Sequence, residues 1–179
     1  MKKLILSFAL VTGLALSSFA QDSKYKLSLG GELLGAIGDA TEFYSIGYGG
    51  SFQAEYKLNE KLNLTASGAY VMLSVSQRYK DIYSPWGVEV ENSTFYPVKA
   101  GLKYSVYKNI YLAGEAGASI SKDKLVRETS FAYSGGVGTS LPISKRSALD
   151  LGLRYEAWSL NSSNTYSFVG LRAAYAFGF

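Results

Sequence analysis

Three charged residues of one segment, Asp150, Arg154 and Glu156, are separated by even numbers of positions. In an extended strand such residues project from the same face, because successive side chains alternate in direction. Two carboxylates beside a guanidinium could form a salt-bridged cluster, conduct protons or ions, or act as a paired-carboxylate site. Opposite charges on an inward face must pair, since an isolated buried charge is very costly. A salt-bridged, structural cluster is therefore the interpretation that we prefer.

Further charged residues lie at matching positions in the neighbouring segments. Arg172 is on the next segment along the chain, and Glu115 is two segments away. We expect Arg172 to pair with Asp150 or Glu156, and Arg154 to pair with Glu115. The predicted network on the inner face of the strands consists of Glu32, Glu55, Lys99, Lys103, Glu115, Asp150, Arg154, Glu156 and Arg172.

Catalytic chemistry has little support in this chain of 179 residues. Histidine and cysteine are both absent, which removes the commonest general base, the thiolate nucleophile and most transition-metal sites. A lysine-activated serine would be the remaining design, and no serine is set apart by its neighbours. The acidic residues expected in loops, Asp39, Glu42, Asp81 and Glu89, lack the Asp-x-Asp-Gly spacing of a calcium loop. We therefore expect no enzyme activity, no metal and no cofactor.

The first twenty residues have the features of a secretory signal. Lys2 and Lys3 precede an apolar stretch that is too short to cross a bilayer, and Ser18 and Ala20 supply small residues before a cleavage site. We expect residues 1–20 to be removed and residues 21–179 to form one domain. Loss of the two lysines lowers the net charge from +4 to +2, so the sequence gives no argument for a nucleic-acid partner.

Beyond residue 20 the hydrophobic pattern has a period of two, which indicates strands with two different faces. Eight such segments cover residues 25–37, 44–58, 62–76, 93–105, 110–121, 130–141, 148–158 and 166–179. One face of every segment carries no charge. The opposite faces hold Lys26, Glu32, Glu55, Lys57, Lys99, Lys103, Glu115, Asp150, Arg154, Glu156 and Arg172, among many small and polar residues.

The uncharged face ends in aromatic residues, as the surface of a membrane barrel does. These residues are Tyr25, Tyr44, Tyr56, Tyr70, Tyr96, Tyr104, Phe131, Tyr133, Tyr155, Phe177 and Phe179. The apolar face would then contact lipid, and the small, polar face would line a narrow lumen. A sheet in lipid must close, because unpaired backbone groups are prohibitively costly there. The soluble alternative is a lipocalin-like cup or a sandwich.

The connections alternate between short and long, which is typical of outer-membrane barrels. Short turns occupy 59–61, 107–109 and 143–147, and longer loops occupy 39–43, 77–92, 122–129 and 160–165. The pattern predicts an all-β, antiparallel up-and-down transmembrane β-barrel of eight strands, with both termini in the periplasm. Ten strands are the alternative if 77–92 holds another hairpin. Pro97 falls on an inward position, where it predicts a bulge or the end of hydrogen bonding.

The segment 77–92 is the most individual part of the sequence. Alternation persists on both sides of its central turn, so strands three and four would continue above the membrane as a two-stranded extension. Tyr79, Tyr83 and Trp86 would then be contact residues for an extracellular protein or surface ligand. In the alternative, these aromatic side chains cover the barrel mouth or lie at the level of the lipid headgroups.

The end of the chain resembles a known recognition signal. Val169–Phe179 alternates and ends on an aromatic residue, like the terminal strand that the barrel-assembly machinery of bacterial outer membranes recognises. Tyr175, Phe177 and Phe179 would carry this assembly signal. Three more segments, Tyr96–Tyr104, Tyr111–Ala118 and Leu141–Tyr155, resemble the outer-membrane β-barrel domain family, which includes porin-like and small eight-stranded barrels.

The resemblance implies the barrel fold, a location in the bacterial outer membrane, and contact with outer-membrane lipid and the assembly machinery. It implies little about activity. An eight-stranded barrel has an interior that side chains fill, so an open pore is not expected. We expect a monomer with a structural or surface-interaction role carried by its extracellular loops. The alternative is a narrow channel, or a barrel that binds or transports a small ligand.

Overall fold

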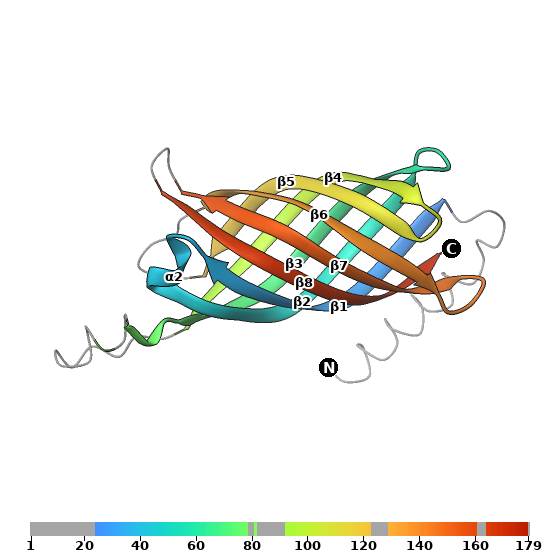
Figure 1. Ribbon diagram of the computed structural model, residues 1–179. Coiled ribbons are helices and arrows are strands. Elements are labelled where there is room, and N and C mark those ends of the chain that lie inside the picture. Colours follow the sequence, from blue (N-terminus) through green and yellow to red (C-terminus); the bar gives the residue numbers. More distant parts are fainter. Residues whose placement is uncertain (1–23, 79–80, 82–91, 123–128, 161–163, 179) are drawn as a thin grey trace, which may run out of the picture.

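The computed structural model describes residues 24–78, 81, 92–122, 129–160 and 164–178. Within them, eight antiparallel strands form a closed barrel in which each strand pairs with its neighbours in sequence and the first pairs with the last (Figure 1). The strands are β1 (Tyr25–Ile37), β2 (Tyr44–Lys57), β3 (Leu62–Val75), β4 (Ser93–Tyr107), β5 (Ile110–Ser121), β6 (Thr129–Pro142), β7 (Ser147–Ser159) and β8 (Thr165–Gly178). A short helix, α2 (Ala40–Phe43), joins β1 to β2.

This architecture confirms the predicted eight-stranded, up-and-down barrel. Every strand begins and ends within two residues of the bounds predicted from the alternation. β3 and β4 pair directly with each other, so the ten-stranded alternative is wrong. None of the helices in the described parts of the chain is long and apolar enough to cross a membrane.

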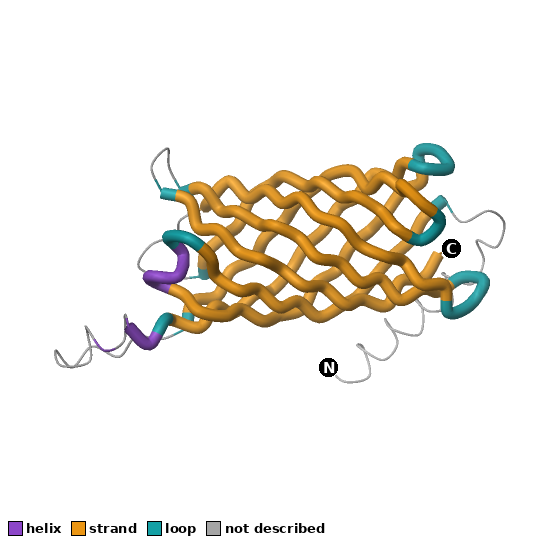
Figure 2. The backbone as a smooth tube through the Cα atoms, viewed as in Figure 1, coloured by secondary structure: helices purple, strands orange, loops and turns teal. Residues whose placement is uncertain are grey.

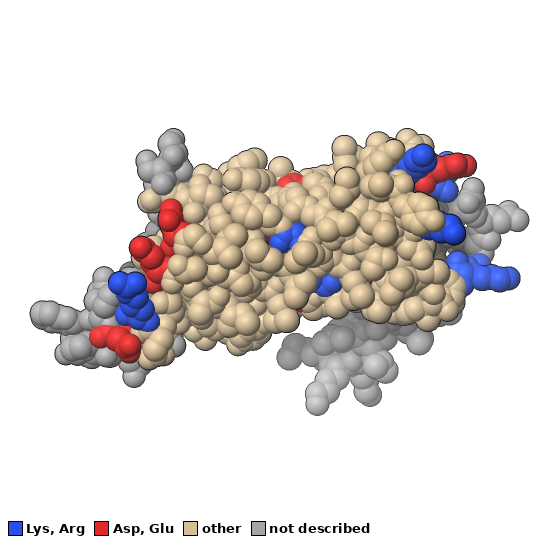
Figure 3. All heavy atoms as spheres, in the orientation of Figure 1, with Lys and Arg blue, Asp and Glu red and all other residues tan. Residues whose placement is uncertain are grey.

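The two faces of the wall differ as the alternation predicts. In β1, Leu29 and Leu33 are exposed on the outside, whereas Ser28 and Glu32 are buried on the inside. The same division holds around the barrel, so that large apolar side chains form its outer surface. Figure 3 shows charged side chains gathered toward the two ends, with a wide and largely uncharged band between them. An outer surface of this kind requires an apolar solvent.

Tyr44 is an exception to the predicted facing. The register between β2 and β3 shifts between Tyr44, which is opposite Val75, and Gly47, which is opposite Leu73. Three steps along β2 therefore match two steps along β3, and this bulge turns Tyr44 inward. Its ring lies 6.1 Å from that of Phe95, between centroids. The prediction that Tyr44 belongs to the outer aromatic rim is wrong, because alternation does not reveal a bulge.

Pro97 lies on the inner face of β4, as expected, but neither prediction about its effect is correct. The ladder with β3 omits the pairs between Gly68–Val98 and Val71–Phe95, and the register is the same on both sides of this gap. On the other edge, Pro97 remains paired with Ser119 of β5. A missing N–H interrupts one ladder locally, and the barrel tolerates this without a bulge or a strand end.

The connections divide the barrel into two distinct ends, which Figures 1 and 2 show at the right and left. The turn end holds residues 58–61, 108–109 and 143–146 and the described parts of both termini, and the loop end holds the four other connections. At the loop end, Gln77, Arg78 and Asp81 are helical. β3 therefore ends at Val75, and the predicted two-stranded extension does not begin there. Tyr79, Tyr83 and Trp86 lie outside the described residues.

Candidate functional site

The nine residues of the predicted charge network all point into the lumen, where we call them the ionic network. Six of them are buried: Glu32, Glu55, Lys99, Lys103, Asp150 and Glu156. The other three, Glu115, Arg154 and Arg172, are partly buried. They come from β1, β2, β4, β5, β7 and β8, so closure of the barrel is what brings them together.

The part of the ionic network nearer the turn end is centred on Lys103. Its Nζ lies 2.6 Å from an oxygen of Asp150 and 2.9 Å from an oxygen of Glu55. The Tyr111 hydroxyl donates a hydrogen bond of 2.6 Å to the other oxygen of Asp150. Lys103 Nζ also lies 3.9 Å from the centre of the Tyr111 ring. Arg172 completes the group at 3.7 Å from Asp150.

The part nearer the loop end is centred on Glu156, which is 0% exposed. Arg154 Nε lies 2.6 Å from one of its oxygens, and Lys99 Nζ lies 3.0 Å from the other. The indole Nε1–H of Trp158 donates to the latter oxygen at 2.9 Å. Arg154 also pairs with Glu32. Three donors thus compensate one fully buried carboxylate, as a buried charge requires.

A third group surrounds Glu115 on β5. Gln53 and Thr65 donate to its Oε1 at 2.9 Å, and Ser67 donates to its Oε2 at 3.0 Å. Lys99 is the nearest cation, at 3.9 Å. The sequence reasoning did not single out Gln53, Thr65, Ser67 or Tyr111. Their odd numbers put all four on the inner face of their strands, which is the signal that could have identified them.

The predicted pairs are correct in one case and wrong in the other. Arg172 pairs with Asp150, as expected. Arg154 pairs with Glu32 and Glu156, and not with Glu115. Gly170 of β8 lies between Arg154 and β1, and a Cβ at this glycine would touch the arginine side chain. The path across Gly170 to the seam between β8 and β1 is therefore open to the guanidinium.

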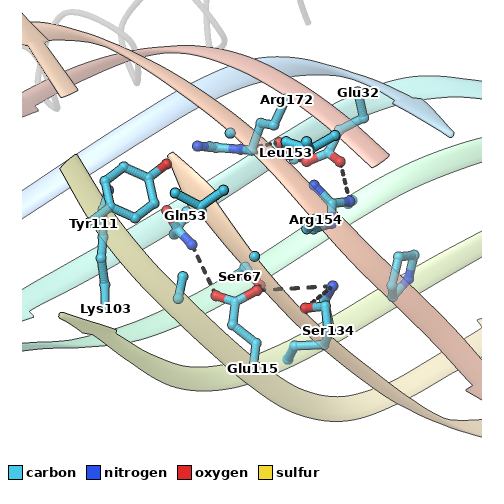
Figure 4. Close-up of a pocket in the computed structure, with 18 of the residues that line it drawn as sticks. Glu32, Gln53, Ser67, Lys103, Tyr111, Glu115, Ser134, Leu153, Arg154 and Arg172 are labelled. Atoms are coloured by element: carbon cyan, nitrogen blue, oxygen red, sulfur yellow. Dashed lines mark hydrogen bonds and ion pairs between the residues drawn. The ribbon is translucent and has the colours of Figure 1, made fainter. Parts of the chain in front are cut away.

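A small cavity remains inside the ionic network (Figure 4). Its volume is about 70 Å³, and its lining includes Glu32, Gln53, Glu115, Arg154 and Arg172. A space of this size has room for a few water molecules. Lys103 and Tyr111 line both this cavity and a second pocket at the turn end, so these two side chains separate the cavity from the mouth.

The lumen near the loop end is apolar, which the sequence reasoning did not foresee. The loop-end cluster consists of Leu34, Ala40, Val71, Leu73, Phe95, Ala132, Trp158 and Phe168. The Trp158 ring lies 4.9 Å from that of Phe95 and 4.8 Å from that of Phe168, between centroids. Both Trp158 and Phe168 are 0% exposed. The prediction of a small, polar inner face is therefore wrong at this end.

Two of the predicted assembly residues, Tyr175 and Phe177, lie in the part of β8 nearest the turn end. Tyr175 is exposed on the outer face, Phe177 is partly buried, and Phe179 lies outside the described residues. In the described part of the chain, no group of three or more acidic side chains is arranged to hold a metal ion.

Comparisons with known proteins agree with this architecture. Residues 6–177 match the family model of the outer membrane protein beta-barrel domain. A search of curated proteins found no match. Among solved structures, the attachment invasion locus protein Ail of Yersinia pestis is similar, with a TM-score of 0.56, 18% identity, and coverage of 88% of this chain and 100% of Ail.

Two further structures show the same fold. Neisserial surface protein A has a TM-score of 0.63 and 14% identity, with 88% of this chain and 98% of that chain covered. OprG from Pseudomonas aeruginosa has a TM-score of 0.55 and 9% identity, with 89% and 97% covered. The family match spans nearly the whole sequence, and the outer surface is apolar. The chain therefore belongs to the outer membrane protein β-barrel domain family and is an eight-stranded transmembrane barrel of the bacterial outer membrane.

Proposed function

We propose that this barrel neither conducts nor catalyses, and that its role is structural or is carried by contacts of its extracellular loops. The observation that supports this proposal is a lumen that side chains obstruct on both sides of its internal cavity. Lys103 and Tyr111 separate the cavity from the turn-end mouth, and the loop-end cluster fills the lumen toward the other end. With the interior filled, the surfaces available for recognition are the loops and the two rims.

The narrow-channel alternative is tested by electrical recording. The purified barrel is inserted into a planar bilayer, and a large porin inserted in the same way serves as the positive control. We expect no discrete conductance steps, because a cavity of about 70 Å³ lined by paired charges offers no continuous water path. Reproducible single-channel steps would refute the non-conducting part of the proposal.

The loop end has a charge that limits its partners. Its described charged residues are Asp39, Glu42 and Asp81 against Arg78 and Lys122. One of the similar structures is Ail in complex with a heparin analogue, sucrose octasulfate. A polyanion of that kind is poorly matched to the described loop end of this chain, where acidic residues outnumber basic ones. For this chain we therefore favour an uncharged or basic protein surface as the partner, contacted by Tyr79, Tyr83 and Trp86.

A loop replacement separates a structural role from a surface role. Residues 78–91 are replaced by a short Gly-Ser turn, and the variant, the wild type and an empty vector are compared in a deletion strain. We expect the variant to lose adhesion to protein-coated surfaces or other cells while it retains resistance to detergents. The role is structural if the wild-type gene restores detergent resistance but has no effect on adhesion, and if the loop-replaced variant restores detergent resistance equally well. Wild-type adhesion by the loop-replaced variant would exclude the surface role.

Export and assembly follow from the two ends of the chain. We propose that residues 1–20 are removed and that both termini of the mature barrel face the periplasm. We also propose that the barrel-assembly machinery recognises Tyr175, Phe177 and Phe179, and that the assembled protein is a monomer. Mass measurement of the purified protein tests cleavage after Ala20. Removal of Phe179 should impair assembly in cells far more than refolding in detergent. Equal effects in both would contradict the assembly role.

Absence of catalysis is tested on the membrane itself. The carboxylates of the ionic network are paired with lysine or arginine, which leaves them poorly suited to act as general bases. We expect the lipid A mass spectra of a deletion strain and its parent to be identical. A mass difference restored by the wild-type gene would show lipid-modifying activity.

A further inference from the structure

Charged side chains outside the lumen are distributed unequally between the two ends of the barrel. The described turn end holds seven basic residues, Lys24, Lys26, Lys57, Lys61, Lys108, Lys145 and Arg146, and one acidic residue, Glu60. The described loop end, by contrast, holds three acidic residues and two basic ones. Figure 3 shows basic side chains gathered at the right, which is the turn end. The turn end therefore has a positive potential that attracts anions.

This positive charge surrounds a pocket, which we call the mouth pocket. It has a volume of about 370 Å³ and lies where the lumen opens at the turn end. Five basic residues line it: Lys26, Lys103, Lys108, Lys145 and Arg146. No acidic residue of the described chain is among its lining residues. Its volume is within the range of small-ligand sites, about 300–1,000 Å³.

Two of these cations, Lys26 and Lys103, already form ion pairs with carboxylates inside the lumen. Glu55 lies 4.0 Å from Lys26 and 2.9 Å from Lys103, and Asp150 also pairs with Lys103. The other three, Lys108, Lys145 and Arg146, are exposed on the β4–β5 and β6–β7 turns and form no ion pair with any described residue. Three cations without an ion-pair partner in the described chain thus line one opening, and a bound anion would lower their mutual repulsion.

The backbone at Lys108 adds a separate observation. Its φ is 28°, in the left-handed region that glycine and asparagine adopt with least strain. The turn nevertheless carries a lysine there, followed by Asn109. The lysine therefore adds a positive charge to the mouth in spite of an unfavourable backbone conformation.

The geometry points to an oxyanion-binding site in the mouth pocket, whose ligand carries phosphate groups. Serine and asparagine side chains also line the pocket, among them Ser105, Asn109 and Ser140, and add hydrogen-bonding groups beside the cations. A phosphate accepts several charge-assisted hydrogen bonds at once, which matches cations that come from separate turns. Free phosphate esters and the headgroups of phospholipids in the adjoining leaflet share this chemistry.

The site is tested by calorimetric titration of pyrophosphate into the barrel in a non-ionic detergent. The triple variant K108Q/K145Q/R146Q removes the three uncompensated cations of the pocket. The matched control, K24Q/K57Q/K61Q, removes three exposed lysines from the same end that do not line the pocket. We expect saturable binding to the wild type, a loss of affinity of about tenfold or more in the pocket variant, and a change within about twofold in the control.

Two results would overturn the inference. One is equal loss of affinity in both triple variants, because a diffuse positive field would act without a pocket. The other is absence of saturable pyrophosphate binding to the wild type. Heat-dependent migration in gels checks that all three proteins are folded. The residues altered in the pocket variant lie on turns outside the strand ladders, and the three control lysines are exposed at or beside strand ends.

The source of the phosphate is distinguished in nanodiscs of phosphatidylcholine with and without phosphatidylglycerol. If a headgroup occupies the site, phosphatidylglycerol competes with pyrophosphate and lowers its affinity for the wild type and the control variant. Native mass spectrometry then finds this lipid bound to the wild type and the control variant, but not to the pocket variant. If the ligand is free, the pyrophosphate affinity is the same in both nanodiscs. Both results support the site, and retention of the lipid by the pocket variant contradicts a headgroup source.

Discussion

The two halves of the lumen are filled in different ways. Toward the loop end, Trp158, Phe168 and Phe95 pack against one another as a soluble protein core does. Toward the turn end, Lys103, Asp150 and their partners fill the space with paired charges. When one side chain of a packed apolar core is truncated, the loss in the free energy of unfolding increases with the volume of the cavity that remains. A charge network leaves an uncompensated charge in a buried site when one member is lost.

The halves meet at two residues on one strand. Glu156 belongs to the ionic network. Trp158, two residues further along β7 and on the same inner face, belongs to the loop-end cluster. The indole N–H of Trp158 donates to Glu156 at 2.9 Å, which satisfies the polar atom of an otherwise apolar side chain. Substitutions at these two positions therefore compare the two kinds of filling at nearly the same depth.

The largest effect is expected for Glu156→Leu. It leaves Lys99 without its closest carboxylate and Arg154 without one of its two carboxylate partners in a buried site. We expect the free energy of unfolding to fall by about 5 kcal/mol, measured by urea titration in lipid vesicles with tryptophan fluorescence. Glu60→Gln, on an exposed turn, is the control and should change the free energy of unfolding by less than about 0.5 kcal/mol.

Addition of Lys99→Met to Glu156→Leu sharpens the comparison. Removal of the orphaned cation should recover part of the lost stability, so that the double variant unfolds at a higher urea concentration than Glu156→Leu alone. Strictly additive losses would show that the charges act independently, and the view of the ionic network as a coupled unit would fail.

A smaller effect is expected for Trp158→Ala, in the loop-end cluster. The substitution leaves a cavity among apolar neighbours and should lower the free energy of unfolding by about 3 kcal/mol, measured by gel migration after urea treatment. Phe131→Ala is the control on the outer face, where the side chain is 58% exposed and lipid replaces the lost contacts. Equal losses at both positions would argue against a packed core in the lumen.

Gly138→Ala examines the boundary between packing and charge. A Cβ at Gly138 would overlap the ring of Tyr111, which must then move away from Asp150 and Lys103, and it would also press on the backbone carbonyl of Leu151. We expect a loss of about 2 kcal/mol in the free energy of unfolding, measured by urea titration. Gly135→Ala on the same strand is the matched control, because its Cβ would meet nothing within 4 Å. A neutral Gly138→Ala would mean that the Tyr111 position is not fixed by close packing.

The strands and their facing were predictable, since the alternation extends over eight segments and a strand has a period of two. Features that depend on a local change of register or on closure were not. Tyr44 turns inward at a bulge, and Arg154 reaches Glu32 across the seam between β8 and β1. Neither the extra residue of a bulge nor the choice among carboxylates two strands away is encoded in a pattern of hydrophobicity.

The loop-end cluster illustrates a different failure. Val71, Leu73 and Phe95 have the odd numbers of inner-face residues, so their positions were available from the sequence. They were overlooked because the inner face was taken to be polar along its whole length. A lumen of eight strands needs only to be filled, and apolar side chains fill it as well as paired charges do.

The smallest effect is expected for Tyr111→Phe. The substitution removes the 2.6 Å hydrogen bond to Asp150 and keeps the ring beneath Lys103. Because Asp150 retains Lys103 at 2.6 Å and Arg172 at 3.7 Å, its charge stays compensated. We therefore expect a loss of about 1.5 kcal/mol in the free energy of unfolding, measured by urea titration beside Tyr133→Phe, an outer-face control on β6. If Tyr111→Phe lowered the free energy of unfolding as much as Glu156→Leu, one hydroxyl would be as important as a buried charge. The difference between the two halves of the lumen would then depend on where a residue lies and not on whether it is charged.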